Sequence, residues 1–251
     1  SPPVGAPCKK EEKAMSIILG RKALPAIVVG SLLAAASSAN AGLAPDVQIS
    51  LQASNGFNQV LNPAGSSVGG DLYNSDGATG DADFDFDFDF DVDGSTANSP
   101  DMFLGSGFTL VNNSGDTLEF TIELLLPLDD SAGPFADYGG SAGFTITGLE
   151  GILMSLGGPV WSAFADGALV DSAFDDPYML ESMAGGGSNS DSANVAGAIG
   201  GPVNNTLAVS FNFSLSGNTS LTHTGAFGVV PAPSVLALLG LAGVARRRRR
   251  A

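Results

Sequence analysis

The sequence predicts an all-β protein built on a single antiparallel β-sandwich with loops rich in Gly, Ser and Asp. Three observations support this fold class. Apolar and polar residues alternate with period two in several segments, as they do in strands that have one face on a core and one in water. Clusters of Gly, Ser, Asn and Asp separate these segments, and such clusters are typical of turns. Long runs with apolar residues three and four apart, which would indicate helices, are scarce.

The clearest expected strand is TLEFTIELLL at residues 117–126. Every second residue would face the core and the residues between would face water, with Leu118, Phe120, Ile122, Leu124 and Leu126 inward and Thr117, Glu119, Thr121 and Glu123 outward. The segment before it, FTLVNNSGD at 108–116, is a strand followed by turn residues. Together the two segments predict a β-hairpin.

Other segments repeat this pattern. TLAVSFNFSLS at 206–216 has the most regular alternation, with Leu207, Val209, Phe211, Phe213 and Leu215 inward, and VQISLQA at 47–53 and GFTITG at 143–148 are shorter. Several short strands separated by turns favour a sandwich of jelly-roll or Ig-like topology. VWSAFADGALVDSAF at 160–174 fits a strand or a short helix, and the Gly-rich stretch at 184–201 is expected to be a mobile loop.

Residues 81–94, DADFDFDFDFDVDG, form the most unusual segment. As a strand it would place seven carboxylates on one face and Phe84, Phe86, Phe88 and Phe90 on the other. Same-face neighbours lie about 6.8 Å apart, so repulsion in water costs about 0.6 kcal/mol per adjacent pair, or roughly 3–4 kcal/mol for six pairs. Burying four Phe side chains contributes about 6–12 kcal/mol. The strand is therefore stable provided that its Asp face stays in water.

The Asp row is also a candidate calcium site. Asp89, Asp91 and Asp93 match the start of an EF-hand loop, but Pro100 stands at position twelve, where that loop has Glu, and no amphipathic helix flanks the segment. An EF-hand is therefore rejected. A looser Ca²⁺ site that includes turn carbonyls stays open, and its candidate ligands are Asp87, Asp89, Asp91 and Asp93. The favoured interpretation is a solvated acidic strand without a cofactor.

The distribution of charge bounds the function. The chain has 26 acidic and 10 basic residues, a formal net charge of −16, and no Lys or Arg between Lys22 and Arg246. An interior without cations repels nucleic acid and offers no side chain that could clamp a phosphate or carboxylate group. Both basic clusters lie beside apolar runs, which is the pattern of targeting signals.

The N-terminal basic cluster predicts a secretory signal peptide at residues 15–41. Met15 fits a start because residues 1–14 are polar and begin without Met. The expected parts follow in order: Arg21 and Lys22, the apolar stretch ALPAIVVGSLLAAA at 23–36, and the A-x-A site of Ala39 and Ala41. Cleavage after Ala41 would remove Cys8, the only cysteine, and would exclude disulfides and thiolate chemistry. The alternative is a short N-terminal helix of a cytosolic protein.

The C-terminal cluster ends a second three-part segment. Its parts are Val230, Pro231, Ala232, Pro233 and Ser234, then VLALLGLAGVA at 235–245, then Arg246, Arg247, Arg248, Arg249 and Arg250. The apolar run is shorter than the roughly 20 residues of a spanning helix, and the arginines hold that end in the cytoplasm. Residues 230–251 resemble the PEP-CTERM sorting signal, with one departure: Ala232 stands where that signal usually has Glu.

The resemblance is confined to this segment, and it implies a route of sorting. The route belongs to Gram-negative bacteria, in which a short C-terminal apolar helix is held transiently in the inner membrane. An exosortase-type membrane enzyme then cuts near the Pro motif and delivers the protein to the cell surface or extracellular matrix. An ordinary C-terminal membrane anchor is the alternative. The part between the two signals, residues 42–229, has a length suited to one domain.

Catalytic motifs are weak. GGSAG at 139–143 fits G-x-S-x-G with Ser141 as nucleophile and His223 as base, but that motif needs a strand before the serine and a helix after it. Here a loop is expected before it and a strand after it, and His223 is expected on the surface or on an edge strand. Glycoside hydrolysis needs two carboxylates, for which the candidates are Glu119, Glu123, Glu150 and Glu181. Trp161 and the tyrosines are expected to pack rather than to stack on sugars.

The sequence therefore predicts a non-catalytic, exported protein of the cell surface or extracellular matrix. Its acidity would keep it soluble and let it bridge to extracellular polysaccharide through divalent cations, and nucleic acid is not expected as a partner. Two alternatives stay open, a calcium-dependent carbohydrate-binding module and a secreted hydrolase.

Overall fold

The computed structural model describes residues 46–69, 72–94, 102–129 and 136–231. All of them belong to the unit that runs from Ala39 to Ala251. They form fifteen β-strands and no helix, which confirms the all-β class for this part of the chain. None of the described residues forms a helix long and apolar enough to cross a membrane.

Nearly all of the two expected targeting signals falls outside the described residues. This holds for residues 1–14, for the signal peptide at 15–41 with Ala39 and Ala41, and for Ala232, Pro233 and the apolar run with Arg246 to Arg250. These assignments stay predictions. Only Val230 and Pro231 of the C-terminal signal are described, and they continue strand β15 two residues past the expected domain end at Val229.

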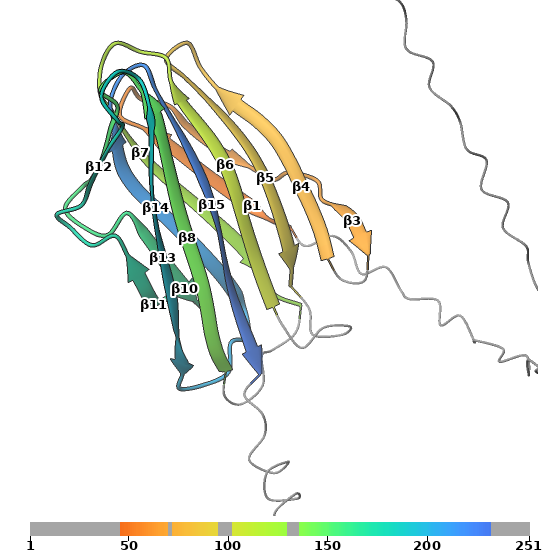
Figure 1. Cartoon of the computed structure of the whole chain (residues 1–251). Coiled ribbons are helices and arrows are strands. Elements are labelled where there is room, and N and C mark those ends of the chain that lie inside the picture. The colour runs from red at the N-terminus through yellow and green to blue at the C-terminus, as the bar shows by residue number, and fades with distance from the viewer. Residues whose placement is uncertain (1–45, 70–71, 95–101, 130–135, 232–251) are drawn as a thin grey trace, which may run out of the picture. The chain divides into compact units, whose positions relative to one another are not determined.

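The strands form two antiparallel sheets that face each other (Figure 1). Sheet A has the order β11-β10-β14-β7-β1-β2, and β9 also lies beside β14, with β12 on its other side. Its strands are β1 (Gln48–Ala53), β2 (Asn58–Leu61), β7 (Leu118–Pro127), β9 (Ile152–Ser155), β10 (Trp161–Ala165), β11 (Ala168–Ala173), β12 (Met179–Glu181) and β14 (Thr206–Leu215).

Sheet B has the order β13-β8-β15-β6-β5-β4-β3. Its strands are β3 (Ser66–Gly69), β4 (Leu72–Gly80), β5 (Phe84–Asp93), β6 (Met102–Asn112), β8 (Ala136–Gly148), β13 (Ser188–Ile199) and β15 (Thr219–Pro231). Two facing antiparallel sheets confirm the β-sandwich. The choice between jelly-roll and Ig-like topology stays a prediction.

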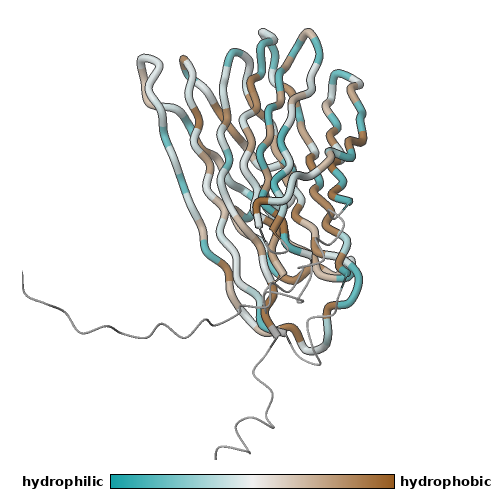
Figure 2. The backbone as a smooth tube through the Cα atoms, turned by 90° about the vertical axis from the view of Figure 1, so that its right-hand side faces the viewer, coloured by the Kyte–Doolittle hydropathy of each residue, from teal (hydrophilic) through white to brown (hydrophobic). Residues whose placement is uncertain are grey.

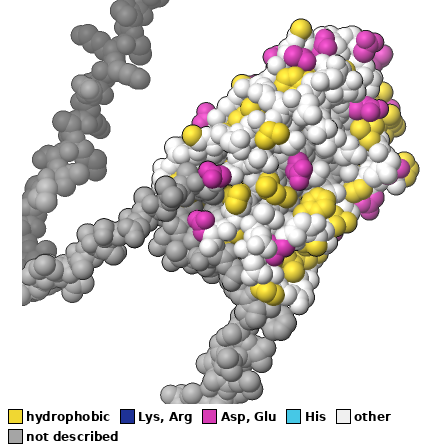
Figure 3. Space-filling model, turned by 180° about the vertical axis from the view of Figure 1, so that it is seen from behind, with side chains coloured by type: hydrophobic (Ala, Val, Ile, Leu, Met, Phe, Trp, Pro, Cys, Tyr) yellow, Lys and Arg dark blue, Asp and Glu magenta, His cyan; other side chains and the backbone are white. Residues whose placement is uncertain are grey.

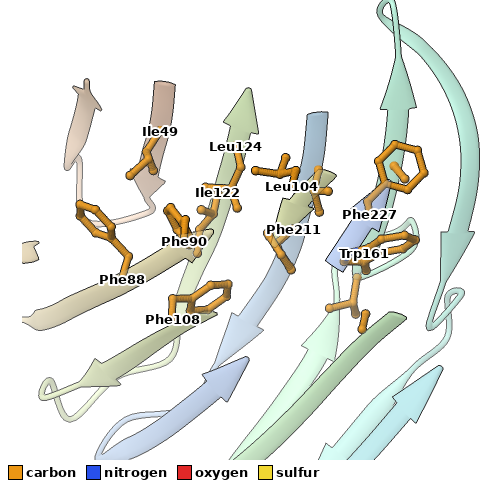
Figure 4. Packing of buried hydrophobic residues seen from close by; sticks show 14 of the residues in the cluster. Ile49, Phe88, Phe90, Leu104, Phe108, Ile122, Leu124, Trp161, Phe211 and Phe227 are labelled. Atoms are coloured by element: carbon orange, nitrogen blue, oxygen red, sulfur yellow. The ribbon is translucent and has the colours of Figure 1, made fainter. Parts of the chain in front are cut away.

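The core lies between the sheets and follows from the period-two alternation. The five inward residues predicted in β7 are buried and Glu119, Thr121 and Glu123 are exposed, and the five inward residues predicted in β14 are buried as well. Hydrophobic and hydrophilic residues follow each other along the strands in Figure 2. Side chains from both sheets meet in one apolar layer in Figure 4, among them Phe88, Phe90, Phe108, Ile49, Ile122 and Phe211.

Strand β5 has the predicted two faces, but its acid row is shorter than expected. Its four Phe side chains are buried, and Phe84 contacts Phe120 of sheet A with ring centroids 5.3 Å apart. Asp81 and Asp83 lie before the strand, and Asp93 is buried at its end. Four carboxylates rather than seven therefore share the wet face, which are those of Asp85, Asp87, Asp89 and Asp91.

The predicted hairpin of residues 108–126 is wrong, because its two strands belong to different sheets. β6 pairs with β5 and β15, whereas β7 pairs with β1 and β14. The buried Asn112 side chain holds the crossing, since its amide donates to the backbone carbonyls of Asp116 and Leu215 at 2.9 Å each. The turn thus carries the chain from one layer to the other instead of folding it back.

The region that alternation described poorly is also built of strands. Residues 160–174 contain the hairpin of β10 and β11, whose turn places Asp166 and Gly167 at positive φ. The mobile loop expected at 184–201 is wrong for most of its length, because β13 pairs with β8 from Ser188 to Ile199. The small side chains of β13 gave too little hydrophobic contrast for the alternation to be visible, although its register is continuous.

Candidate functional site on the outer face of sheet B

The outer face of sheet B brings the Asp row beside a field of hydroxyl groups. Strand pairing places Asp87 opposite Thr109, Thr109 opposite Thr222, and Thr222 opposite Thr145. The row continues to Ser190 on β13. Adjacent strands lie about 4.8 Å apart, so the hydroxyl groups form a line across the strands. The Oγ1 atoms of Thr109 and Thr222 are 3.5 Å apart.

The next row contains two glycines in place of side chains. It runs through Asp89, Gly107, Thr224, Gly143 and Ser192 in adjacent strands. Neither glycine has a positive φ, so both adopt strand conformations that other residues also reach. What the glycines contribute is the missing side chain, which lowers the surface at two points along the row.

Two adjoining hollows lie over these glycines. The first, of about 280 Å³, is lined by Asp87, Phe88, Asp89, Gly107, Phe108, Thr109, Thr222, His223 and Thr224. The second, of about 300 Å³, is lined by Gly143, Phe144, Thr145, Ser190, Asp191, Ser192 and Thr224. No residue of sheet A lines either hollow, so both open on the outer face, and Thr224 forms the ridge between them. We call this pair of hollows the sheet B trough.

Asparagine side chains donate hydrogen bonds to the acidic residues along this edge. The Asn74 amide donates to Asp89 and Asp91 at 2.6 and 3.1 Å, and Asn113 donates to Asp85 at 2.8 Å. Asn55 in the same way joins Asp81 and Asp83, at 2.9 and 3.0 Å. These neutral amides supply donors in a described chain that contains no Lys or Arg. Among the described side chains none donates to the Asp87 carboxylate, whose lone pairs face water at the rim of the sheet B trough.

The candidate calcium ligands are only partly brought together. Asp87, Asp89 and Asp91 share the exposed face of β5, but Asp93 is buried. Within the described ranges, no three Asp, Glu, His or Cys side chains form a group that could hold a metal ion. The Ca²⁺ site therefore stays a prediction.

The candidate hydrolase residues lie apart. Ser141 is on the outer face of β8, whereas His223 points into the core from β15, so the sheet separates them. Residues 139–143 lie inside β8, and the segment after them continues the strand. Glu119 and Glu123 lie four residues apart on the wet face of β7, which in a strand is about 13 Å. The remaining two candidates are Glu150, in the turn after β8, and Glu181, at the end of β12.

His223 is buried in the centre of sheet B, so the expected surface or edge position is wrong. Its ring packs against Phe108, Phe144 and Phe211 at centroid distances of 5.0, 5.1 and 4.6 Å. Nε2 lies 3.0 Å from Ser106 Oγ, while Nδ1 has no hydrogen-bond partner. Burial lowers the pKa of His223 to about 3, and the Gly143 backbone opposes this only in part. The sequence contains a signal for this position, because residues an even number of positions apart in a strand share a face. His223 lies two residues from Leu221 and four from Phe227, and both are buried.

The aromatic residues confirm the expectation of packing. Trp161 and Tyr73 are buried, and none of the aromatic side chains that the structure describes is exposed. Two tyrosines instead link the sheets at one side of the sandwich. Tyr138 donates to Asp171 at 2.9 Å and Tyr178 donates to Asp191 at 3.2 Å. The sheet B trough therefore has hydroxyl and carboxylate groups but no aromatic platform for stacking.

Comparisons with known proteins assign this chain to no family. No protein-family model and no curated protein matches it. Among solved structures it is similar to the enzymatically active domain of bacteriophage CBA120 tailspike protein 4, at 13% identity and a TM-score of 0.27, over 74% of this chain and 19% of that one.

Two further structures show similarity at the same low level. One is from the infectious bursal disease virus Gx strain, at 12% identity and a TM-score of 0.25, over 83% of this chain and 53% of that one. The other is TmCBM61 in complex with beta-1,4-galactotriose, at 9% identity and a TM-score of 0.18, over 60% and 90%. The chain thus spans about a fifth of the tailspike chain and about half of the viral one.

Proposed function

We propose that this chain is a non-catalytic exported protein of a Gram-negative bacterium. An exosortase-type enzyme sorts and trims it, and it stays at the cell surface or in the extracellular matrix. There the outer face of sheet B contacts extracellular polysaccharide. The PEP-CTERM-like segment at 230–251 and the signal peptide at 15–41 provide the route.

One observation carries this proposal, which is the separation of charge along the chain. A folded sandwich of acidic and neutral side chains lies between two basic ends that have the composition of targeting signals. Acidic side chains are scattered over the face seen in Figure 3, and no Lys or Arg belongs to the described atoms. Such a surface favours solubility and repels other polyanions.

The structure does not bring the candidate hydrolase residues together. An acyl-transfer site needs its nucleophile and base within hydrogen-bond reach, and here a sheet lies between Ser141 and His223. A retaining glycosidase needs carboxyl groups about 5–5.5 Å apart and an inverting one about 6.5–9.5 Å. The spacing of Glu119 and Glu123 along β7 exceeds both.

The sheet B trough supports a binding role instead. Hydroxyl side chains can donate to and accept from sugar hydroxyls, and carboxylates can accept from them, at a net contribution of about 0.5–1.5 kcal/mol per neutral bond and about 1.5–3 kcal/mol per bond to a carboxylate. Without aromatic stacking, each copy would bind weakly. A protein held in a matrix can act through many such contacts in parallel.

A calcium-dependent carbohydrate-binding module is the second candidate. The unpaired Asp87 carboxylate at the rim of the sheet B trough favours it, because a bound sugar could complete the ligand set of a cation held there. Calorimetric titration with Ca²⁺ in the presence of polysaccharide decides between the two. A saturable, stoichiometric site favours the module, whereas diffuse binding that disappears in salt favours the matrix protein.

Mass spectrometry of the protein from fractions of its native host tests the route. We expect a mature chain that begins at Gly42, ends near Pro231 to Pro233, and is found with surface or matrix material. An intact Arg246 to Arg250 tail on surface material, or the whole chain in the cytosol, would overturn the proposal.

Filling the sheet B trough tests the binding face. A Cβ at Gly143 would meet the Thr224 carbonyl at 3.4 Å, an ordinary contact, so the Cβ of Gly143→Val fits at the floor of the trough. Gly139→Val is the matched control, since Gly139 lies on the same strand and face, outside the trough, with no atom within 4 Å of the added Cβ. In affinity electrophoresis with extracellular polysaccharide from the host, Gly143→Val should lose retardation and Gly139→Val should keep it. Equal retardation of both variants would place the contact elsewhere.

A further inference from the structure

We infer that the polysaccharide bound in the sheet B trough carries free amino groups. This inference rests on the proposed function and names the chemical class of its ligand. It follows from the charge beside the trough, from the hydrogen-bonding state of one carboxylate, and from what the face lacks.

Negative charge gathers beside the sheet B trough. Asp76, Asp85, Asp87, Asp89 and Asp91 lie on neighbouring strands β4 and β5, and pairing places Asp76 opposite Asp89. No Lys or Arg of the described chain neutralises them. Like charges gathered along one side of a groove create a potential that attracts a partner of opposite sign. An anionic polysaccharide would be repelled from this side of the sheet B trough.

The Asp87 carboxylate differs from its neighbours in its hydrogen bonds. The neighbouring carboxylates of Asp85, Asp89 and Asp91 already accept amide donors from Asn113 and Asn74, whereas Asp87 accepts none among the described residues. Its side chain lines the first hollow together with Thr109 and Thr222. An ammonium group brings three donors and a positive charge, so it can bond Asp87 while adjacent sugar hydroxyls bond the threonines.

Possible occupants differ in what they gain from this face. A neutral polysaccharide can donate its hydroxyl groups to the carboxylates, but it brings no opposite charge and finds no exposed aromatic side chain among the described residues. An ammonium donor adds the attraction of opposite charges to its hydrogen bond, so it binds a carboxylate more tightly than a neutral hydroxyl does. An amino-sugar polymer therefore gains most from this face. The two hollows share Thr224 and lie across strands β5 to β13, over about 19 Å, which suits an extended chain.

Isothermal titration calorimetry with two matched oligosaccharides tests the inference. The probes are a glucosamine hexasaccharide and its N-acetylated form, compared at about pH 6. The protein is expressed in its native host and recovered in mature form. We expect the free-amine hexasaccharide to bind at least roughly tenfold more tightly than the acetylated one, with an affinity that falls as salt rises.

Two double variants separate the sheet B trough from the general acidity of the protein. Asp87→Asn with Asp89→Asn removes two charges at the trough, and Glu119→Gln with Glu123→Gln removes two from the exposed face of β7 in sheet A. The first pair should weaken binding of the free-amine probe roughly tenfold, and the second by less than about twofold. Thermal unfolding of both variants verifies that each is folded.

The outcomes distinguish this inference from the proposed function. Equal affinity for both hexasaccharides would overturn the amino-group inference and leave polysaccharide binding intact. Equal weakening by both double variants would mean that the whole polyanion, rather than the sheet B trough, attracts the ligand. Failure of a surface-located protein to bind either probe would also overturn the inference, while the proposed location would stand. A protein found uncut in the cytosol would overturn the proposed function itself.

Discussion

The inner and outer faces of sheet B are made by the same strands but obey different constraints. On the inner face, Phe86, Phe108 and His223 lie in contact with other rings and have almost no exposed surface. On the outer face, Asp87 and Thr222 are exposed and Thr109 is half-buried, and strand pairing places the three side by side. Along β5, β6 and β15, successive residues thus alternate between side chains that fill the core and side chains that present polar groups on the surface. A regular alternation can therefore specify the fold with one set of residues and leave the other set free for binding.

Removing a ring from the inner face should have the largest effect. Phe86→Ala should lower the free energy of unfolding by about 3–5 kcal/mol, because it leaves a cavity beside Phe88 and Phe108. Urea unfolding followed by Trp161 fluorescence measures the change. A loss below about 1 kcal/mol would mean that the Phe row is not part of a close-packed core.

Acid should weaken the inner face through His223. Its pKa is lowered to about 3 in the folded protein, from 6.5 in the unfolded chain. Stability is therefore complete above pH 6.5 and is lost as the pH falls toward 3, because only the unfolded chain then binds the proton. Between pH 7 and pH 5 the loss should be about 2 kcal/mol. In the variant His223→Gln the free energy of unfolding should be nearly constant over that interval, and an equal slope in both proteins would assign the effect to carboxylates.

The lateral links between the sheets should have an intermediate effect. Tyr138→Phe removes the hydrogen bond to Asp171 and should lower the free energy of unfolding by about 0.5–1.5 kcal/mol. That hydrogen bond, together with burial and the charge of Asp171, raises the pKa of Tyr138. The contribution is thus present below about pH 10 and is lost as the pH rises beyond it. Unfolding of both proteins at pH 8 and pH 11 measures it: the difference between wild type and variant should shrink at pH 11, and an equal difference at both pH values would contradict the link.

A substitution on the outer face should have the smallest effect on the free energy of unfolding. Asp87→Ala should alter the free energy of unfolding by less than about 0.5 kcal/mol, and in the stabilising direction, because it removes repulsion from Asp85 and Asp89 without breaking a described hydrogen bond. The same urea unfolding experiment compares it directly with Phe86→Ala. A loss similar to that of Phe86→Ala would show that the outer face also takes part in the packing of the fold.

The sequence was sufficient for the elements in which hydrophobic contrast is strong. In β5, β7 and β14 every second residue is large and apolar, so both the strand and its buried face could be predicted. The contrast does not say which strands pair. Residues 108–126 have a strand–turn–strand pattern that a hairpin and a crossing between sheets share, and the hydrogen bonds of the Asn112 amide at the crossing are not visible in that pattern.

The candidate site was harder to predict because its residues are small and distant in sequence. Thr109, Gly143 and Thr222 come together only through the register of three strands. The Asp row drew attention to Ca²⁺, while the hollows beside it depend on glycines that carry no chemical signal of their own. His223 could have been placed by parity, yet its polar neighbours in SLTHTG concealed that it alternates with buried Leu221.

The order of synthesis has a particular consequence for this topology. Strand β15 is the last described strand, and it occupies the middle of sheet B, between β8 and β6. Until residues 219–231 leave the ribosome, sheet B lacks the strand that joins the β13–β8 pair to the β6–β5 pair. Strand pairings so remote in sequence form slowly, and this one cannot begin before residues 219–231 have been made. Sheet B is therefore completed late, because its central strand follows the strands on both sides of it in the chain.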